Sequence, residues 1–286
     1  MTTRWRWPIR VAALGYLGLL IVIPVGSVFY RAFEHGLGAA WDAISTPDAV
    51  HALLLTLLVV LIAVPANTIF GVGTALILAR HRFRGAWLLD ALVDIPLAIS
   101  PVVVGLALIL VYGKAGWFGN LLAGWGIQVI FSVPGIVMAS AAVSLPYVVR
   151  EVLPVLQEIG DEQEQAAATL GAGPLATFRR ITLPSIRHGL AYGVTLTTAR
   201  VLGEFGAVVI VSGAIEGRTQ TLTLFIQDSV DNLNPVGAYA GSVILALIAL
   251  VVLAILGRNT EGKERRWQST SDQFQSDSEK PLLSTT

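Results

Sequence analysis

Long apolar stretches recur along this chain and are separated by polar segments. A helix that crosses a bilayer needs about 20 consecutive, mostly apolar residues. The pattern therefore predicts an all-α polytopic membrane protein with six transmembrane helices. The second stretch is long enough to tilt or bend, and Pro65 lies inside it. The six stretches are Val11–Tyr30, Ala52–Ala79, Trp87–Tyr112, Val129–Val149, Leu190–Ser212 and Val236–Leu256.

The basic residues predict the orientation of these helices, because cytoplasmic loops carry an excess of Lys and Arg. If the N-terminus lies inside and six helices alternate, the outer side holds only Arg31, Lys114 and Arg218. The opposite orientation inverts the bias, so both termini are predicted to be cytoplasmic. Besides basic residues of the C-terminal tail, the inner side then holds Arg4, Arg6, Arg10, Arg80, Arg82, Arg84, Arg150, Arg179, Arg180 and Arg187.

Composition supports a membrane protein and excludes several classes of function. Charged residues make up 13% of the chain, whereas soluble domains carry roughly 25%. The formal net charge is zero, so nucleic acid is not an expected partner. The chain has no cysteine, which excludes disulfides, thiolate metal sites and a cysteine nucleophile. No metal site is predicted, since metal-ligand spacing is absent among His35, His51, His81 and His188.

A polar insert at about residues 150–189 separates the fourth and fifth apolar stretches, on the predicted cytoplasmic side. Asp161 is a good N-cap, and Glu164, three residues on, completes a capping-box pattern. Gly171 is the expected glycine after a helix end, and Pro174 suits the first position of a second helix. The insert is thus predicted to hold two short helices joined by a tight glycine turn.

The faces of these two helices suggest a docking surface. The first carries the small side chains Ala166, Ala167 and Ala168, and in the second Leu175, Phe178 and Ile181 share one face. Such a surface fits the groove of a partner protein. An amphipathic loop that lies on lipid headgroups explains the apolar face equally well, and spacing alone leaves the two interpretations open.

The insert resembles the cytoplasmic "EAA" loop of ATP-binding-cassette importer permeases. The family pattern is Glu-Ala-Ala, three residues, Gly, and then Ile-x-Leu-Pro ten residues later. Gln165 stands where the family has glutamate, although Glu164 is adjacent. The resemblance implies that the loop docks into a nucleotide-binding ATPase subunit and transmits its closure. The matching positions are Gln165, Ala166, Ala167, Gly171, Ile181, Leu183 and Pro184.

Two further segments are similar to oxyanion permeases. Thr198–Ala207 resembles a stretch shared by sulfate and molybdate permeases, and Val211–Leu222 is closer to the W-type subunit of sulfate/thiosulfate importers. The resemblance covers most of the chain through about Leu256. It implies the permease fold of that family and a role as transmembrane subunit of an ATP-driven sulfate or thiosulfate importer. A molybdate or tungstate permease is the alternative.

The resemblance also implies the partners. These are ATPase subunits that bind ATP and Mg, a second related permease, and an extracytoplasmic sulfate-binding protein, all at a bacterial plasma membrane. The chain itself needs no cofactor. Its sequence Gly171-Ala172-Gly173-Pro174 lacks the Lys-Ser/Thr ending of a phosphate-binding loop.

Ionisable residues inside the apolar stretches are candidates for function, since they are costly in lipid. Arg200 and Glu204 are four residues apart and are expected to share a helix face with Thr197. They either form a packing pair or line the translocation path. Ser100, beside Pro101, offers a hydroxyl at a helix break.

The carboxylates Asp90 and Asp94 also share a helix face. They are expected near the cytoplasmic interface, within reach of Arg80, Arg82 or Arg84. Two aspartates on one helix suit an intramembrane aspartyl protease poorly, because that chemistry needs carboxylates that converge from different helices. An ion-coupled secondary transporter is a third class of function, but it needs no docking helix for an ATPase.

Two segments remain, one in an outer loop and one at the C-terminal end of the sequence. Thr221–Ile226 is expected to be a short amphipathic element lying on the membrane. Residues 1–257 form the predicted transmembrane domain. The segment 258–286 is rich in Ser, Thr, Gln and charge, and it is predicted to be a disordered cytoplasmic tail.

The predicted orientation has a direct test, because the native chain has no cysteine to give a background signal. Single cysteines at Lys114 and Arg218 should react with an impermeant thiol reagent added outside the cell. Cysteines at Arg82 and Arg179 should react only after the membrane is permeabilised. The reversed labelling pattern would overturn the orientation.

Overall fold

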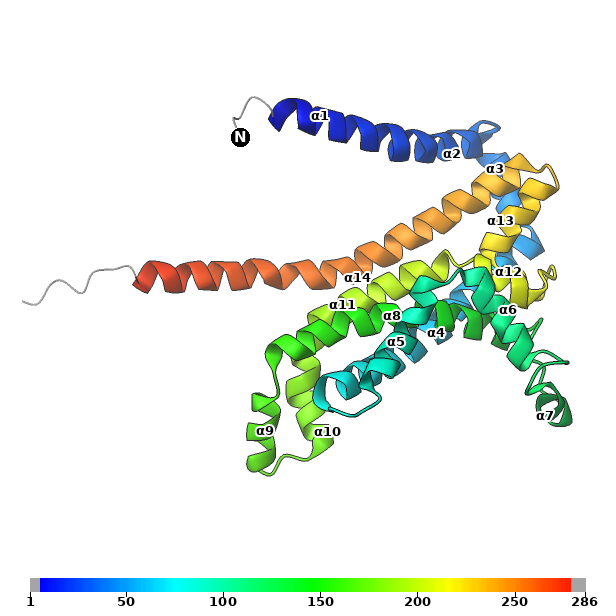
Figure 1. Cartoon of the computed structure of the whole chain (residues 1–286). Coiled ribbons are helices and arrows are strands. Elements are labelled where there is room, and N and C mark those ends of the chain that lie inside the picture. The colour runs from blue at the N-terminus through cyan, green and yellow to red at the C-terminus, as the bar shows by residue number, and fades with distance from the viewer. Residues whose placement is uncertain (1–5, 279–286) are drawn as a thin grey trace, which may run out of the picture. The chain divides into compact units, whose positions relative to one another are not determined.

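The computed structural model describes the backbone of residues 6–278 and the side chains of residues 10–256, and within that range all regular structure is helical (Figure 1). The first half contains α1 (Arg6–Leu17), the π-helical turn η2 (Gly18–Val22), α2 (Ile23–Phe33), α3 (Gly36–Ile44), α4 (Pro47–Arg80), α5 (Ala86–Ala98), α6 (Pro101–Tyr112) and α7 (Gly119–Gly124). The second half contains α8 (Val133–Ile159), α9 (Glu162–Thr169), α10 (Pro174–Thr177), the π-helical turn η3 (Phe178–Thr182), α11 (Leu183–Leu202), α12 (Gly206–Ser212), α13 (Leu222–Asp231) and α14 (Pro235–Ser278).

Four helical segments of the described range are long and apolar enough to cross a membrane. They are Arg10–Phe33, Pro47–Arg80, Val133–Ile159 and Pro235–Leu256. Two bent pairs, α5 with α6 and α11 with α12, raise the number to six if each pair is one span. The six predicted stretches thus correspond to these segments. Pro65 lies inside α4 without ending it.

The bends lie at identifiable residues. Ser100 is extended, with φ −61° and ψ 138°, and Pro101 begins α6. Proline disfavours the helical conformation in the residue before it and suits the first position of a helix, so Ser100-Pro101 separates α5 from α6. The second break, residues 203–205, separates α11 from α12.

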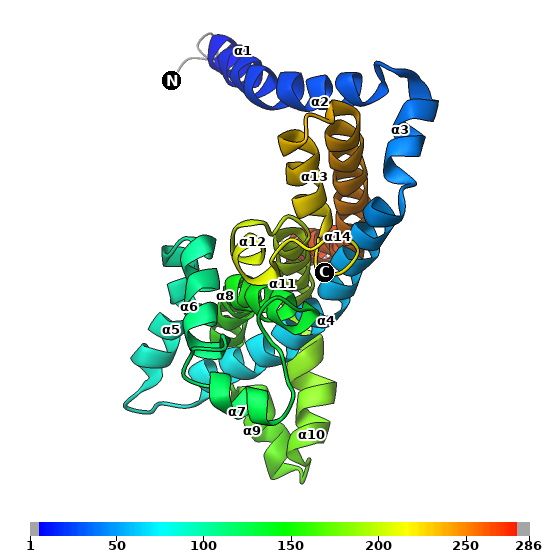
Figure 2. The same ribbon diagram turned by 90° about the vertical axis from the view of Figure 1, so that its right-hand side faces the viewer.

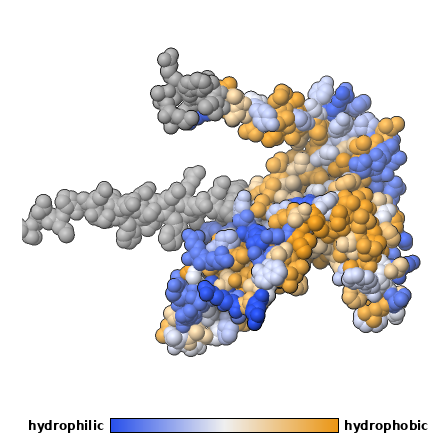
Figure 3. All heavy atoms as spheres, in the orientation of Figure 1, coloured by the Kyte–Doolittle hydropathy of each residue, from blue (hydrophilic) through white to orange (hydrophobic). Residues whose placement is uncertain are grey.

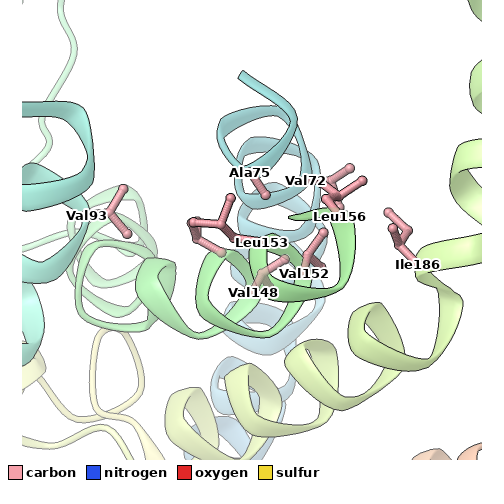
Figure 4. Packing of buried hydrophobic residues seen from close by; sticks show 9 residues of the cluster. Val72, Ala75, Val93, Val148, Val152, Leu153, Leu156 and Ile186 are labelled. Carbon is pink, nitrogen blue, oxygen red and sulfur yellow. The ribbon is translucent and has the colours of Figure 1, made fainter. Parts of the chain in front are cut away.

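The chain folds into two compact units, and α4, α8 and α14 contribute to both. One unit comprises residues 63–99, 141–201 and 250–286. Its core is a cluster of aliphatic side chains around α8 (Figure 4). The cluster consists of Val72, Ala75, Val93, Val148, Val149, Val152, Leu153, Leu156 and Ile186.

Glycines allow helices of this unit to pack closely on α8. A Cβ at Gly189 would lie 2.7 Å from the carbonyl oxygen of Glu151, and a Cβ at Gly193 would lie 3.1 Å from the Cα of Val148. Gly189 and Gly193 are four residues apart, so they lie on one face of α11. Small residues at this spacing let helix backbones approach each other, which is the usual way that helices associate in membranes.

The other unit comprises residues 1–62, 100–140 and 202–249. In it α12 packs beside α6 (Figures 1 and 2), and a Cβ at Gly105 would lie 2.9 Å from the carbonyl oxygen of Ala207. Leu222 and Phe225 of α13 pack against Ala49 and Ala52 of α4. Within this unit, α6 is therefore in close contact with α12, and α13 with α4.

The packing of α13 corrects one expectation. Thr221–Ile226 was expected to lie on the membrane as an amphipathic element, but Leu222–Asp231 is a helix whose Leu222, Leu224 and Phe225 are buried in the protein. The backbone N–H of Leu222 also donates to the Oγ1 of Thr56, at 2.8 Å. Apolar residues in a polar loop cover α4 here instead of facing lipid.

The last helix continues beyond the final apolar stretch, to Ser278. The side chains from residue 257 onward, and residues 279–286 altogether, lie outside the described part of the chain. The disorder predicted for 258–286 therefore stays a prediction, although the described backbone as far as Ser278 is helical.

Candidate functional site

The polar insert forms a hairpin of α9 and α10, and Figure 3 shows hydrophilic residues gathered in this region. Asp161 occupies the N-cap position of α9, as predicted. The capping box is wrong, because within the described part of the chain the Asp161 side chain makes no capping hydrogen bond. The carboxylate of Glu164 points to a different partner, a guanidinium.

Arg80, the last residue of α4, binds Glu164 through two nitrogens of its guanidinium group. Its Nε donates to Glu164 Oε2 at 3.0 Å, and its Nη2 donates to Oε1 at 3.2 Å. Its Nη1 donates to the carbonyl oxygen of Leu156 at 2.9 Å. That carbonyl belongs to the last turn of α8, where the helix leaves its own carbonyls without partners. Arg80 therefore joins the ends of α4 and α8 to α9.

A hydroxyl adds a fourth element to this cluster. Thr182 of η3 is buried, and its Oγ1 donates to Glu164 Oε1 at 2.7 Å. Burial by itself would raise the pKa of Glu164, but the hydrogen bonds from Arg80 and Thr182 and the charge of Arg80 lower that pKa overall. Glu164 is thus held as a carboxylate. We refer to Arg80, Leu156, Glu164 and Thr182 as the Glu164 anchor.

The C-terminal end of α9 has the predicted glycine turn. Gly171 has a φ of +83°, in the left-handed region that favours glycine. The N–H of Gly171 donates to the carbonyl of Ala168, and the N–H of Ala172 donates to that of Ala167, both at 3.0 Å. This pair of bonds is a Schellman motif, which satisfies carbonyls at the helix end.

The second helix of the insert differs from its prediction. Pro174 is at the start of α10 as expected, but α10, η3 and α11 follow one another without a break. Phe178 packs against the core around α8, whereas the Leu175 side chain is 70% exposed. Leu175 and Phe178 are three residues apart and lie on the same side of the helix, but only Phe178 reaches the core around α8.

The outer side of the hairpin carries exposed apolar residues. Leu170 is 88% exposed and lies beside Gly171, close in sequence to exposed Leu175. Gln165 is exposed, so the Glu164 carboxylate faces the protein and its neighbour faces outward. The other residues that match the EAA pattern also differ in their exposure to solvent. Ala166, Gly171 and Pro184 are exposed, Ala167 and Ile181 are half-buried, and Leu183 packs against the core around α8.

The candidate residues in the apolar stretches lie in different local settings. Thr197 of α11 is fully buried, Arg200 is half-buried, and Ser100 is exposed at the break before α6. Glu204 does not share a helix face with Arg200, because α11 ends at Leu202. The Oε1 of Glu204 instead accepts the backbone N–H of Ala207 at 2.8 Å, in the first turn of α12. The shared face was wrong because the spacing rule assumes an unbroken helix, whereas the choice between a packing pair and the translocation path stays a prediction.

The two aspartates of α5 also have a partner that differs from the expected one. Arg150 of α8 donates through Nε and Nη2 to Asp94, at 2.7 and 2.6 Å, and its Nη2 lies 2.8 Å from Asp90 Oδ1. The expected partners were Arg80, Arg82 or Arg84. Two carboxylates on one apolar helix signal a cation on a neighbouring helix, but their spacing does not identify which one. This cluster fixes α5 to α8.

In the described part of the chain, no group of three His, Asp or Glu side chains is placed to hold a metal ion.

Comparison with known proteins gives consistent similarities. Residues 67–260 match the family described as binding-protein-dependent transport system inner membrane component. The chain is 48% identical over 254 residues to the sulfate transport system permease protein CysW of Synechocystis sp., covering 89% of this chain and 92% of that protein. It is 42% identical to the protein of the same name in Escherichia coli K12, covering 87% of each chain.

A similar fold occurs in a chain of a solved transporter. The crystal structure of a bacterial alginate ABC transporter, in complex with a periplasmic protein bound to alginate pentasaccharide, contains a chain with a TM-score of 0.74. The match covers 90% of this chain and 95% of that one, at 16% sequence identity. At this identity the likeness concerns the fold alone.

The Glu164 anchor leads to a testable prediction. Glu164→Gln removes the charge that Arg80 binds and should loosen α9 by about 2 kcal/mol, the range for hydrogen bonds to charged groups. Amide hydrogen exchange in residues 161–171 should become faster. Because the pKa of Glu164 is lowered, the anchor is intact above the ordinary pKa of glutamate and is lost as the pH falls through the lowered value. The variant should lack this acid dependence.

The matched control is Gln165→Glu, at the adjacent exposed position. It adds a carboxylate without touching Arg80, so exchange in α9 should stay as in the native chain. Equal exchange rates in Glu164→Gln and the native chain would show that the anchor does not hold α9.

Proposed function

The chain belongs to the binding-protein-dependent transport system inner membrane component family, and from this we propose that it is the transmembrane subunit of an ATP-driven sulfate or thiosulfate importer. The similarity to sulfate permeases supports the substrate class, since 42–48% identity extends over nearly the whole of both chains. Molybdate and tungstate are tetrahedral dianions like sulfate, and a permease for them is the alternative that the experiment below includes.

Coupling to an ATPase is the role that we propose for the α9–α10 hairpin. The observation that carries it is the Glu164 anchor, which ties α9 to the ends of α4 and α8 and to η3. A force on α9 is thereby passed to two membrane helices. Leu170 and Leu175 remain exposed for contact with a partner, while Glu164 is used inside the fold. Gln165, at the position of the family's glutamate, then contributes no charge to the docking surface.

The other parts of the importer follow from this proposal. ATP and Mg bind to separate ATPase subunits, so this chain is not an enzyme by itself and carries no cofactor. A second, related permease completes the translocation path. An extracytoplasmic protein delivers the oxyanion. Both termini face the cytoplasm of a cell whose inner membrane holds the complex, and residues 258–286 form a tail beyond the permease domain of residues 1–257.

The translocation path remains a separate part of the proposal. Ser100 and Thr197 offer hydroxyls and Arg200 a positive charge, which are groups that bind oxyanions. Glu204 is buried and accepts a backbone N–H of α12. We assign it to the packing of the helix break, where its charge suits the N-terminal end of α12.

Reconstitution tests the function. The chain should copurify with a second permease and ATPase subunits. In proteoliposomes containing the binding protein, sulfate or thiosulfate should stimulate ATP hydrolysis and enter the vesicles. Stimulation by molybdate or tungstate alone would assign the alternative substrate. Uptake without any ATPase subunit would overturn the importer and favour a secondary transporter.

The hairpin gives a prediction about coupling. Gly171→Val places a β-branched residue at φ +83°, which costs about 1 kcal/mol or more, and it adds bulk at the docking surface. Ala167→Asp adds a charge that docking would bury without a partner. Both should insert in the membrane and pair with the second permease, yet bind the ATPase weakly and uncouple hydrolysis from uptake.

Arg179→Ala is the milder control, since Arg179 is exposed on η3 beyond the glycine turn. ATPase copurification and oxyanion-stimulated hydrolysis should be measured for all three variants. Native values for both Gly171→Val and Ala167→Asp would favour a loop that rests on lipid headgroups.

A further inference from the structure

A polar pocket of about 200 Å³ lies in the unit that contains α3, α12 and α13. Its walls come from the connection between α3 and α4, from the turn before α13, and from the end of α13. Asp48, Glu216, Gln220 and Asp228 line it, together with Asn232 and Asn234. We call this the acidic pocket.

The acidic pocket carries unbalanced negative charge. Three of its lining residues are carboxylates, and its lining includes no Lys, Arg or His. Among the described residues, no basic side chain forms an ion pair with Asp48, Glu216 or Asp228. Arg218 is nearby in sequence but is exposed and does not line the pocket. The pocket is therefore complementary to a cation.

A buried amide gives a second, independent sign of a ligand. Gln220 is 2% exposed, and its Oε1 has no hydrogen-bond partner among the described residues. A buried acceptor without a donor costs free energy, so native proteins usually satisfy such groups. Gln220 also lines the acidic pocket, so a ligand held there would lie against the residue that carries this unpaired acceptor.

The turn that carries Gln220 is held firmly in place. The carbonyl of Ile215 accepts the backbone N–H groups of Thr219 and Gln220, at 2.8 and 3.1 Å. Thr219 is buried, and its Oγ1 donates to the carbonyl of Ser212 at 2.7 Å. Gln220 is thus positioned before any ligand arrives, which lowers the entropic cost of binding.

The spread of the carboxylates indicates the kind of cation. No three acidic or histidine side chains in the described part of the chain are arranged to hold one metal ion. A guanidinium differs from a metal ion because it presents five N–H donors over a planar fork. Its donors point in several directions, so they suit acceptors that do not converge on one point. The charge and the polar lining of the pocket point to an arginine side chain.

The position of Asp48 indicates which partner supplies the arginine. Asp48 is in the first turn of α4, and Arg80 of the Glu164 anchor is its last residue. In the predicted orientation, the segment before α4 and the loop that carries Glu216 and Gln220 both lie on the outer side of the membrane. The acidic pocket then faces the side from which the oxyanion is delivered.

We propose that the acidic pocket receives an arginine side chain of the extracytoplasmic binding protein when that protein docks. This inference rests on the proposed function. The pocket recognises the carrier of the oxyanion and not the oxyanion itself, which its carboxylates would repel.

The test uses the assembled importer in lipid nanodiscs and the sulfate-loaded binding protein of the same importer. The triple variant Asp48→Asn, Glu216→Gln, Asp228→Asn should require about 10-fold more binding protein for half-maximal stimulation of hydrolysis, because charge-assisted hydrogen bonds are lost. Direct binding to immobilised nanodiscs should weaken equally and become less sensitive to salt. Hydrolysis without binding protein should not change.

The matched control is Asp231→Asn, also on α13. Its carboxylate is exposed, accepts the Gln227 side chain at 2.9 Å, and does not line the pocket. It should keep the native affinity. Gln220→Leu should weaken docking, and Gln220→Glu, which keeps an acceptor, should not. An arginine of the binding protein whose change to glutamate is rescued by Asp228→Arg would identify the contact.

Four results would overturn the inference. Native affinity in the triple variant, or an equal loss in Asp231→Asn, would exclude recognition by the pocket. Thermal stabilisation of the native complex by calcium alone, absent in the triple variant, would assign the pocket to a metal ion. Failure of the binding protein to stimulate the native complex at all would overturn the importer itself, and the inference with it.

Discussion

The ion pair between Arg80 and Glu164 is the interaction on which the polar insert depends. It brings together residues 84 positions apart, from the end of a membrane helix and the first turns of α9. Removing two charges from water is costly, and geometry and added hydrogen bonds must offset that cost. Here the guanidinium forms two bonds to one carboxylate and a third to Leu156, and Thr182 adds a fourth. The Arg80–Glu164 pair thus links α4, α8, α9 and η3.

Local signals in the sequence predicted the elements well. The six apolar stretches correspond to four single spans and to two bent helix pairs, which make six spans if each pair crosses the membrane once. The thickness of a bilayer sets the length of such helices. The position of Asp161 before α9, the left-handed Gly171 and the start of α10 at Pro174 were also correct. Each of these three predictions depends only on residues within one turn of a helix end. The preferences of residue types at helix ends are the same in any protein, so the sequence alone is enough.

The errors concern partners that are distant in sequence or helices that break. Glu164 has a good local partner in the capping box, but the guanidinium of Arg80 offers two charge-assisted bonds and prevails. Asp90 and Asp94 needed a cation, and only the packing of α5 on α8 identifies Arg150. Glu204 was placed on a continuous helix that ends two residues earlier. The hydrophobic periodicity of the sequence does not tell which distant residue pairs with a carboxylate, or where a helix breaks.

The length of α4 has a mechanical consequence. Its 34 residues form one helix, about 50 Å long at 1.5 Å per residue, and Pro65 does not interrupt it. Proline has no N–H, so the carbonyl of Leu61 loses its usual partner in the helix. The missing bond lies where α4 passes from one compact unit into the other. The longest uninterrupted helix before α8 thus contains a turn at which bending is easier than elsewhere along it.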